Sequence, residues 1–221
     1  MCIFDESTGM VLDEIINARR TYRMFRPDTP PEDDIRGIIQ AGLAAPFAAA
    51  AVGGKGNEYF RQFFVFPRDS RGLAIAGGLL MRSVHMMAED LEKRMKHNPA
   101  LRSTAEPFSK RLEMIRKAGV VPGVETAPWY IVVAERKGFP PVEQQSLAHC
   151  LENMWLKATA LNLGFQLVSV TGQMGSDPEF CRLLGIQPDA FELNGCAVGY
   201  YMEQLPPSIR PPPDQVTRWM E

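Results

Sequence analysis

The amino-acid sequence predicts an α+β protein in which helices pack around a sheet of four or five strands. Three observations support this fold class. Segments with helical spacing of apolar residues alternate along the chain with short apolar runs typical of buried strands. No G-x-G-x-x-G motif follows the first predicted strand, which argues against a Rossmann dinucleotide-binding domain. Neither an internal repeat nor a low-complexity linker divides the chain, so we expect a single domain over residues 1–221.

The N-terminal part of the chain is predicted to form two helices and one strand. Apolar residues recur at helical spacing over about 10–18, just before a cluster of arginines. Residues 29–32, Thr-Pro-Pro-Glu, have the pattern of a capping box and predict a helix that ends near Pro46. Residues 62–66 form an apolar run stopped by a proline, as expected of a buried strand.

A long helical excursion is predicted between the first and second strands. Residues about 70–97 carry an apolar stripe at helical spacing, and a second helical segment over about 105–118 ends near Gly119. With the linker that follows, the excursion spans residues 70–126. It is suited either to cover a site as a lid or to extend a subunit interface, and the length of its helices favours the interface.

The second half of the chain is predicted to alternate strands with helices. Its elements are, in order, a strand over 129–134, a helix over 142–163 closed by Gly164, a strand over 165–170, a short helix from 176 to Gly185, and a strand over 195–201.

The C-terminal tail is rich in proline. Residues 206–213 contain five prolines, which exclude a helix or a central strand. We therefore expect the tail to run extended across a surface, and in an oligomer that surface could belong to a partner subunit.

Composition narrows the classes of function. The chain has 221 residues, 45% of them hydrophobic and 23% charged, and a net charge of −2, which argues against nucleic acid as the main partner. There is no run of about 18 apolar residues to span a membrane. The N-terminus lacks the features of a signal peptide, and we expect a cytoplasmic protein with reduced cysteines. The four cysteines and three histidines have no metal-ligand spacing, so no metal is expected.

The segment 19–26, Arg-Arg-Thr-Tyr-Arg-Met-Phe-Arg, combines four arginines with a threonine hydroxyl. A guanidinium group presents a planar fork of donors that matches phosphate oxygens. In an extended segment, Thr21 and Arg23 point to the same side. The segment therefore suggests a phosphate clamp. The alternative is a solvated basic patch that pairs with the acidic run at 32–34.

The stretch 47–56 consists mostly of alanine and glycine. Such backbone lets a flat ligand approach closely, and a plain flexible loop is an equal alternative. Its Gly-Gly-Lys-Gly sequence is not a P-loop, because the first glycine and the Ser or Thr after the lysine are both missing.

Several segments together resemble the flavin-dependent nitroreductase family over about 11–66 and 127–213. The matching segments are Arg19-Arg20-Thr21-x-Arg23 followed by Phe25, Ala41 to Pro46, the Asn153-containing helix that runs to Gly164, Ser169-Val170-Thr171-Gly172, and Gly199-Tyr200 followed by Ile209-Arg210-Pro211.

The resemblance implies a nitroreductase-like fold with a mainly antiparallel sheet flanked by helices. It also implies a homodimer whose extended tail reaches the partner subunit, with FMN bound at the subunit interface. NAD(P)H would reduce the flavin, and a planar acceptor, such as a nitroaromatic, a quinone, an enone or a flavin, would then take the electrons. The flavin carries this chemistry, so no catalytic side chain is expected.

The resemblance also implies which residues bind the cofactor. Arg19, Arg23 and Arg210 would hold the phosphate, and Thr21 with Arg20 would reach phosphate or ribityl oxygens. The backbone at Thr171 and Gly172 would donate to the flavin ring. The other implied positions are Pro46, Asn153, Ser169 and Val170.

Two departures from the family pattern leave other functions open. Residues 47–51, Phe-Ala-Ala-Ala-Ala, replace polar residues that usually face the flavin, and Thr171 replaces an acidic residue of many members. The first alternative is therefore a flavin-binding protein without NAD(P)H turnover. The second is a dimerisation module whose arginines pair with the acidic residues 32–34.

Overall fold

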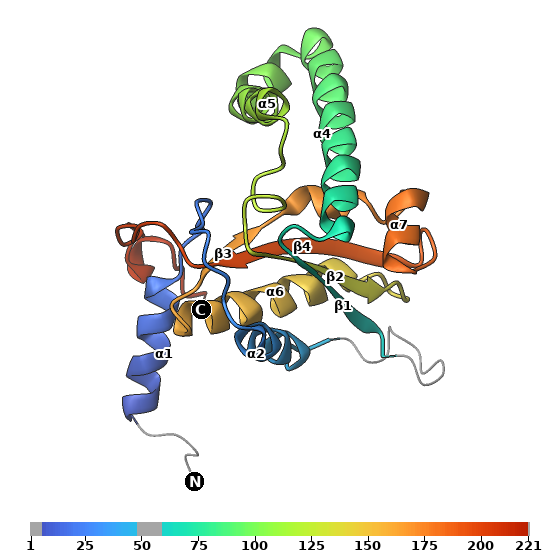
Figure 1. The fold of residues 1–221 in the computed structure, drawn as a ribbon. Helices are drawn as coiled ribbons and strands as arrows, with labels where there is room; N and C mark the ends of the chain where they lie inside the picture. The colour runs from blue at the N-terminus through green and yellow to red at the C-terminus, as the bar shows by residue number, and fades with distance from the viewer. Residues whose placement is uncertain (1–5, 48–58, 221) are drawn as a thin grey trace.

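The computed structural model describes residues 6–47 and 59–220. They form a four-stranded antiparallel sheet in the order β1-β2-β4-β3 (Figure 1). The strands are β1 (Arg61–Pro67), β2 (Trp129–Arg136), β3 (Gly164–Leu167) and β4 (Phe191–Gly199). The α+β class and the four-stranded sheet are therefore as predicted.

Helices cover both faces of the sheet. In Figure 1, α2 and α6 lie below it, while η1, α7 and the first part of α4 lie above it. The helices are α1 (Glu6–Ala18), α2 (Glu32–Leu43), α4 (Arg71–His97), α5 (Pro99–Ala118), α6 (Glu143–Ala160) and α7 (Pro178–Leu184), with the 3-10 helices η1 (Ser169–Gln173) and η2 (Pro213–Gln215).

The central strand β2 is buried on both faces, which explains its continuous apolar sequence. Tyr130 and Val132 face the cluster beneath α4, whereas Ile131 and Val133 face the cluster formed with α2 and α6. The pleat alternates successive side chains between the two faces, so this one strand contributes to two cores.

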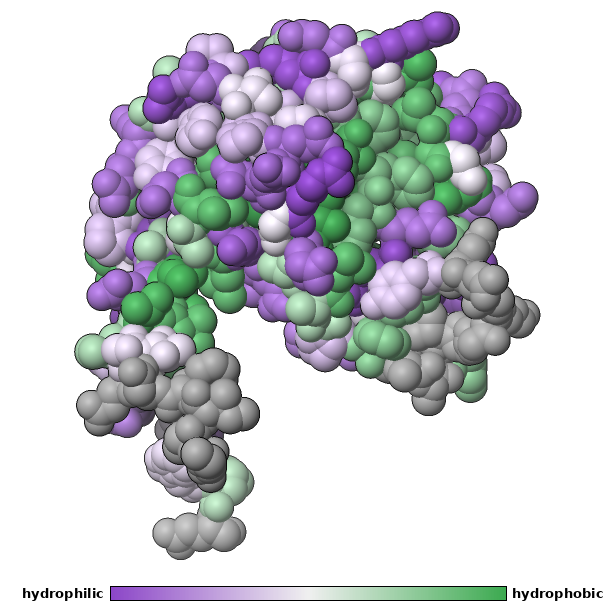
Figure 2. Space-filling view, turned by 60° about the horizontal axis from the view of Figure 1, so that its bottom comes forward, coloured by the Kyte–Doolittle hydropathy of each residue, from purple (hydrophilic) through white to green (hydrophobic). Residues whose placement is uncertain are grey.

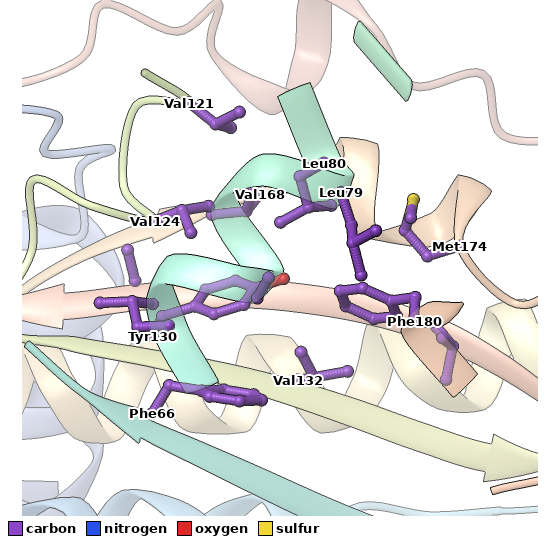
Figure 3. Close-up of a cluster of buried hydrophobic side chains, with 14 of the residues drawn as sticks. Phe66, Leu79, Leu80, Val121, Val124, Tyr130, Val132, Val168, Met174 and Phe180 are labelled. Atoms are coloured by element: carbon purple, nitrogen blue, oxygen red, sulfur yellow. The ribbon is translucent and has the colours of Figure 1, made fainter. Parts of the chain in front are cut away.

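The core beneath α4 is built around aromatic rings. Figure 3 shows Tyr130 and Phe180 below Leu79 and Leu80 of α4, with Phe66 of β1 beside them. The Tyr130 hydroxyl is buried and lies 2.7 Å from the Thr171 Oγ1. In this hydrogen bond one hydroxyl donates to the other, and the contact fixes η1 against the sheet.

The core on the other face brings α2 and α6 close together. A side chain at Gly42 would meet Met154 at 2.8 Å, so the glycine permits this approach. Arg61 and Glu135 form a buried ion pair at the edge of this core, with Nε 3.1 Å from Oε2. Arg61 also donates to the Gly42 carbonyl and to the Ser146 hydroxyl, so its donors are largely satisfied.

The excursion folds as a hairpin of α4 and α5, which rises above the sheet in Figure 1. The Ser70 hydroxyl caps the start of α4, and the Asn98 side chain caps α5. Gly119, with φ of 70°, ends α5 in the left-handed conformation. The second helix therefore begins at Pro99, six residues before the predicted start.

Other predicted boundaries were also wrong. Pro31 occupies the N-cap of α2 and no side chain caps the helix, so the predicted capping box does not form. Gly164 is the first residue of β3 and does not close α6. The third strand ends at Leu167, where the chain turns into η1. The fourth strand begins at Phe191 and ends at Gly199, earlier than predicted.

The two terminal segments lie on the same side of the molecule in Figure 1. In Figure 2, a projection from the body carries green, hydrophobic side chains. Exposed apolar residues occur on α1 and in the tail, namely Met10, Val11, Leu12, Ile16, Ile209, Val216, Trp219 and Met220. None of the described helices combines the length and the apolar character needed to cross a membrane.

Candidate functional site

The arginine segment runs extended beside the ends of β3 and β4. The Tyr22 N–H donates to the Phe165 carbonyl at 3.1 Å, and the Arg26 N–H donates to the Tyr200 carbonyl at 2.8 Å. Thr21 forms a parallel bridge with Phe165. Backbone pairing at both ends therefore holds the segment in the extended form expected from the sequence, next to the sheet.

The first two arginines of the segment make contacts within the chain. The Arg19 guanidinium lies 4.4 Å from the centre of the Trp155 ring, and its Nε lies 3.3 Å from a Glu152 carboxylate oxygen. The Arg20 Nε donates to the Pro206 carbonyl at 2.9 Å, and its Nη1 donates to the Asn17 carbonyl at 2.7 Å. Arg20 therefore joins the end of α1 to the C-terminal tail.

The third arginine, Arg23, lies near Arg111 of α5. Both line a hollow of about 410 Å³, which we call the arginine hollow, together with Met114, Ile115, Ala118 and Pro122. Partial burial and the positive charge of Arg111 lower the pKa of Arg23. Neither arginine forms an ion pair with a carboxylate among the described residues. Two cations close together without a counter-ion favour a ligand with negative charge or carbonyl oxygens.

A second hollow lies between the α4–α5 hairpin and the sheet, and we call it the hairpin cavity. Its volume is about 280 Å³, and its walls are mostly apolar. It shares Arg111, Ile115 and Pro122 with the arginine hollow, so the two are neighbours. The other lining residues come from α4, α5, the 121–122 turn, β3 and η1: Val84, Met87, Phe108, Leu112, Val121, Gln166, Leu167, Val168, Ser169, Val170 and Gln173.

One polar side chain of the hairpin cavity is almost completely buried. Gln166 is 4% exposed, and its Nε2 donates to the Pro122 carbonyl at 3.0 Å. Because a carbonyl oxygen only accepts, this contact fixes which end of the amide is the nitrogen. The Gln166 Oε1 is left without a hydrogen-bond partner among the described residues. A buried acceptor without a donor costs about 1–3 kcal/mol.

The structure brings three of the predicted site residues to these two hollows. Arg23 lines the arginine hollow, and Ser169 and Val170 line the hairpin cavity. Thr21 lies in the same extended segment as Arg23, at the bridge to β3. These residues come from distant parts of the sequence and meet where the arginine segment runs beside the sheet.

Thr171 and Gly172 follow directly on the lining residues, but the polar groups of Thr171 are engaged inside the protein. Its side chain is completely buried and bonded to Tyr130, and its N–H donates to the Val168 carbonyl at 3.0 Å. A side chain at Gly172 would meet the Leu193 carbonyl oxygen at 3.4 Å.

The remaining predicted residues lie outside the lining of both hollows. The Asn153 side chain donates to the Ala41 carbonyl at 3.2 Å and so links α6 to α2. Pro46 lines a separate surface pocket with His149. Arg210 is exposed in the tail. The alanine- and glycine-rich stretch from residue 48 onward lies outside the described residues.

Sequence reasoning missed Arg111 and Gln166. Arg111 belongs to an alternation of charges on a helix, where nothing in the sequence separates it from solvated neighbours. Gln166 had a detectable signal, because it is a polar residue within an apolar strand segment, Phe-Gln-Leu-Val.

A family model described as the nitroreductase family matches residues 16–200. The chain belongs to the nitroreductase family. The matched region contains the arginine segment, all four strands and both hollows, so the site described above lies within the part that defines the family. No curated protein matches this nitroreductase-family chain.

Solved structures share the fold of this nitroreductase-family protein. An FMN-bound nitroreductase from Bacteroides fragilis is 20% identical, with 99% of this chain and 100% of that chain covered and a TM-score of 0.66. An FMN-bound nitroreductase from Desulfitobacterium hafniense is 18% identical, with coverage of 95% and 98% and a TM-score of 0.66. Iodotyrosine deiodinase, bound to FMN and 3-iodo-L-tyrosine, is 19% identical, with coverage of 91% and 95% and a TM-score of 0.63.

Proposed function

We propose that this protein is an FMN-dependent NAD(P)H oxidoreductase that reduces a planar acceptor, such as a nitroaromatic, a quinone, an enone or a flavin. The observation that carries the proposal is the pair of neighbouring hollows, one with apolar walls and one lined by Arg23 and Arg111. Membership of the nitroreductase family supports it, as does the FMN bound in several structures of similar fold.

The residues present fit FMN. Apolar side chains of the α4–α5 hairpin provide a surface for a flat ring, and Arg23 with Arg111 provides donors for its oxygens. When bound, FMN would supply the hydride and electron transfer between NAD(P)H and the acceptor.

The protein would bind and orient the cofactor. Arg23 would contribute to phosphate or ring-oxygen binding, with Thr21 next to it in the extended segment. The Arg19 ion pair with Glu152 involves a half-exposed carboxylate that water can solvate, which leaves Arg19 able to share its charge with a phosphate. No described lining residue of the hairpin cavity is an acid or a histidine, so the proton taken up by the acceptor would come from water.

We propose a homodimer in which the exposed apolar residues of the terminal segments pack against the partner. Met10, Val11 and Leu12 of α1 are each more than half exposed, and Trp219 in the tail is 89% exposed. Apolar side chains gathered in this way are typical of a subunit interface. In such a dimer Arg210 would lie near the partner and could reach its phosphate. Analytical ultracentrifugation of the full chain and of a chain ending at residue 205 tests this role of the tail.

The position of Thr171 favours a second candidate, a flavin-binding protein without NAD(P)H turnover. Its hydroxyl and its N–H are both used inside the protein, so these groups are unavailable to a flavin ring. This candidate also binds FMN but predicts that NAD(P)H leaves the flavin oxidised. The dimerisation module would need the arginines of 19–26 to pair with residues 32–34, whereas among the described residues their ion pairs are Arg19 with Glu152 and Arg26 with Asp28.

The visible absorption spectrum of the purified protein, loaded with FMN and treated anaerobically with NADH and then NADPH, separates these functions. We expect a yellow protein that bleaches, and the nucleotide that bleaches it faster is the preferred donor. A yellow protein that stays yellow supports the second candidate. A protein that does not retain FMN contradicts both.

A further inference from the structure

One face of α5 lines the hairpin cavity. Its four lining residues are spaced three or four positions apart, which places them on the same side of a helix. They are Phe108, Arg111, Leu112 and Ile115. This face therefore presents an aromatic ring, a cation and two aliphatic side chains to a cavity whose other walls, from α4, β3 and η1, are mostly apolar.

Arg111 is a cation of this helix that has no carboxylate partner among the described residues. Three other cations of α5 have one, namely Lys110 with Glu106, Arg116 with Glu92, and Lys117 with Glu113. No described lining residue of the hairpin cavity or of the arginine hollow is acidic. The charge of Arg111 is therefore available to an anion that enters the cavity.

Phe108 supplies a ring surface next to this cation. Its side chain is 48% exposed, although it lines a mostly apolar cavity. A flat ring stacked on Phe108 would remove this surface from water, and aromatic pairs are favourable beyond the area that they bury. Phe108 and Arg111 are three residues apart on one helix face, so a single small molecule that meets both carries its negative group on an aromatic ring.

We infer that the hairpin cavity binds an aromatic carboxylate, with its ring on Phe108 and its carboxylate held by Arg111. A carboxylate matches the planar fork of a guanidinium group, which can donate two parallel hydrogen bonds to it. This inference rests on the proposed function and narrows the planar acceptor to one that carries a negative charge. The α4–α5 hairpin thereby becomes the part of the protein that selects the acceptor.

The cofactor and the acceptor can share Arg111. This residue lines both hollows, and its guanidinium has five N–H donors, so one edge can meet a cofactor oxygen while another meets a carboxylate. A dry cavity of about 150 Å³ is enough to hold benzene. The hairpin cavity, with about 280 Å³, therefore has room for a substituted single ring.

The inference is tested by isothermal titration of the oxidised protein, with FMN in excess, against 4-nitrobenzoate and its neutral isostere 4-nitrobenzamide. Without NAD(P)H neither compound is reduced, so the titrations measure binding alone. We expect 4-nitrobenzoate to bind at least about tenfold more tightly, because the amide lacks the charge that Arg111 would meet. Acetate, which has the charge without the ring, should bind far more weakly than 4-nitrobenzoate. Equal affinities for the two nitro compounds, or acetate as tight as 4-nitrobenzoate, would overturn the inference.

Variants of Arg111 show whether this residue causes the preference for the carboxylate. Arg111→Ala should lose most of the preference, and Arg111→Lys should keep part of it. Arg102→Ala is the matched control for lost charge, because Arg102 is an exposed arginine of the same helix and lies outside the lining of both hollows. An Arg111→Ala protein that keeps the full preference, or an Arg102→Ala protein that loses as much of it, would overturn the assignment.

Phe108 has a different expected signature. Phe108→Leu keeps an apolar side chain but lacks the flat ring, so it should weaken 4-nitrobenzoate and 4-nitrobenzamide by a similar factor. Unchanged affinities for both compounds would overturn the ring contact.

Failure of the proposed function gives a separate result. A protein that retains no FMN, or whose flavin stays oxidised with NAD(P)H, would contradict the proposed function. The same titrations of that protein would still decide the inference, because a preference for 4-nitrobenzoate supports the carboxylate site and equal binding overturns it. The wild-type comparison stands even if a variant fails to fold.

Discussion

Tyr22 and Tyr201 stack with their ring centroids 4.3 Å apart and their planes 14° from parallel. Tyr22 lies within the arginine segment, and Tyr201 follows the last strand. Close to this pair along the chain, the Arg20 Nε donates to the Pro206 carbonyl and so links the same two segments. The arginine segment is therefore held by residues that follow β4, and the start of the tail helps to position Arg23.

We predict that Arg20→Ala loosens the tail. The variant loses the bond to Pro206 and the bonds to the carbonyls at the end of α1, and its free energy of unfolding should fall by about 1 kcal/mol. Limited proteolysis should cut after residue 205 faster than in the wild type. Arg36→Ala, which removes an exposed ion pair with Glu32, is the control and should leave the cutting rate unchanged.

The buried ion pair of Arg61 and Glu135 predicts that the stability losses of substitutions at these two residues do not add. Arg61→Met leaves the Glu135 carboxylate buried without its counter-ion, and should lower the free energy of unfolding by about 3–5 kcal/mol. The double variant Arg61→Met, Glu135→Leu should recover much of this loss. Urea denaturation of the single and double variants measures the coupling. Purely additive losses would show that the two charges do not depend on each other.

The lack of a side chain at Gly195 makes room for Thr171. A Cβ at Gly195 would collide with the Thr171 Oγ1 and approach the Tyr130 ring. Gly195→Ala should therefore cost about 1–3 kcal/mol of stability by overpacking. Gly78→Ala is the matched control: its Cβ would point into open space on α4, and it should gain up to about 1 kcal/mol. Thermal unfolding of the two proteins should shift in opposite directions.

Because the Cys150 thiol is buried, we predict that the protein loses stability at high pH. Burial, opposed by the positive charge of Arg61, raises the pKa of the Cys150 thiol to about 12. From about pH 9 the thiol ionises in the unfolded chain but stays neutral in the folded protein, so stability falls between about pH 9 and pH 12. Cys150→Ala should show a fall that is less steep by about 1.4 kcal/mol per pH unit. Urea denaturation at pH 8 to 11 measures both slopes, and identical slopes would contradict the buried thiol.

Arg23→Ala should weaken FMN binding. Loss of a charge-assisted contact is expected to cost about 1.5–3 kcal/mol, equivalent to a roughly tenfold to 150-fold higher dissociation constant. Arg94→Ala removes an exposed arginine paired with Asp90 on α4 and is the control for lost positive charge. Flavin fluorescence titration gives both values. If Arg94→Ala weakens binding as much as Arg23→Ala does, the effect is net charge and not a contact.

The spacing of apolar residues predicted a helix or strand correctly wherever buried residues recur at regular intervals along that element. The apolar stripe of α6, the continuous apolar run of β2 and the helices of the excursion were predicted because each element is buried by its own periodic residues. Element ends were less predictable. The Thr-Pro-Pro-Glu pattern at 29–32 satisfies a capping rule, yet the extended backbone at Pro31 starts the helix without a side-chain cap.

The contacts of the site residues were harder to predict than the helices and strands, because they involve residues far apart in the sequence. The backbone at Thr171 was expected to donate to a flavin ring, and this stays a prediction. In the folded chain its N–H donates to the Val168 carbonyl and its hydroxyl is bonded to Tyr130 of β2. Arg19 was expected to hold the phosphate and Arg20 to reach phosphate or ribityl oxygens, and both roles stay predictions. In the folded chain Trp155 and Glu152 contact Arg19, and the Pro206 carbonyl contacts Arg20. These partners lie far along the sequence, and no local pattern specifies them.

The sequence by itself determined the α+β class, the main helices and strands, and the family resemblance through the arginine segment. The tertiary structure decided which polar groups remain available to a ligand. Arg111 and Gln166 lie on a helix and a strand far apart in sequence, and they line one cavity because the α4–α5 hairpin folds back over the sheet. The availability of a polar group depends on which partners the fold brings to it, and this is a property of the packed chain.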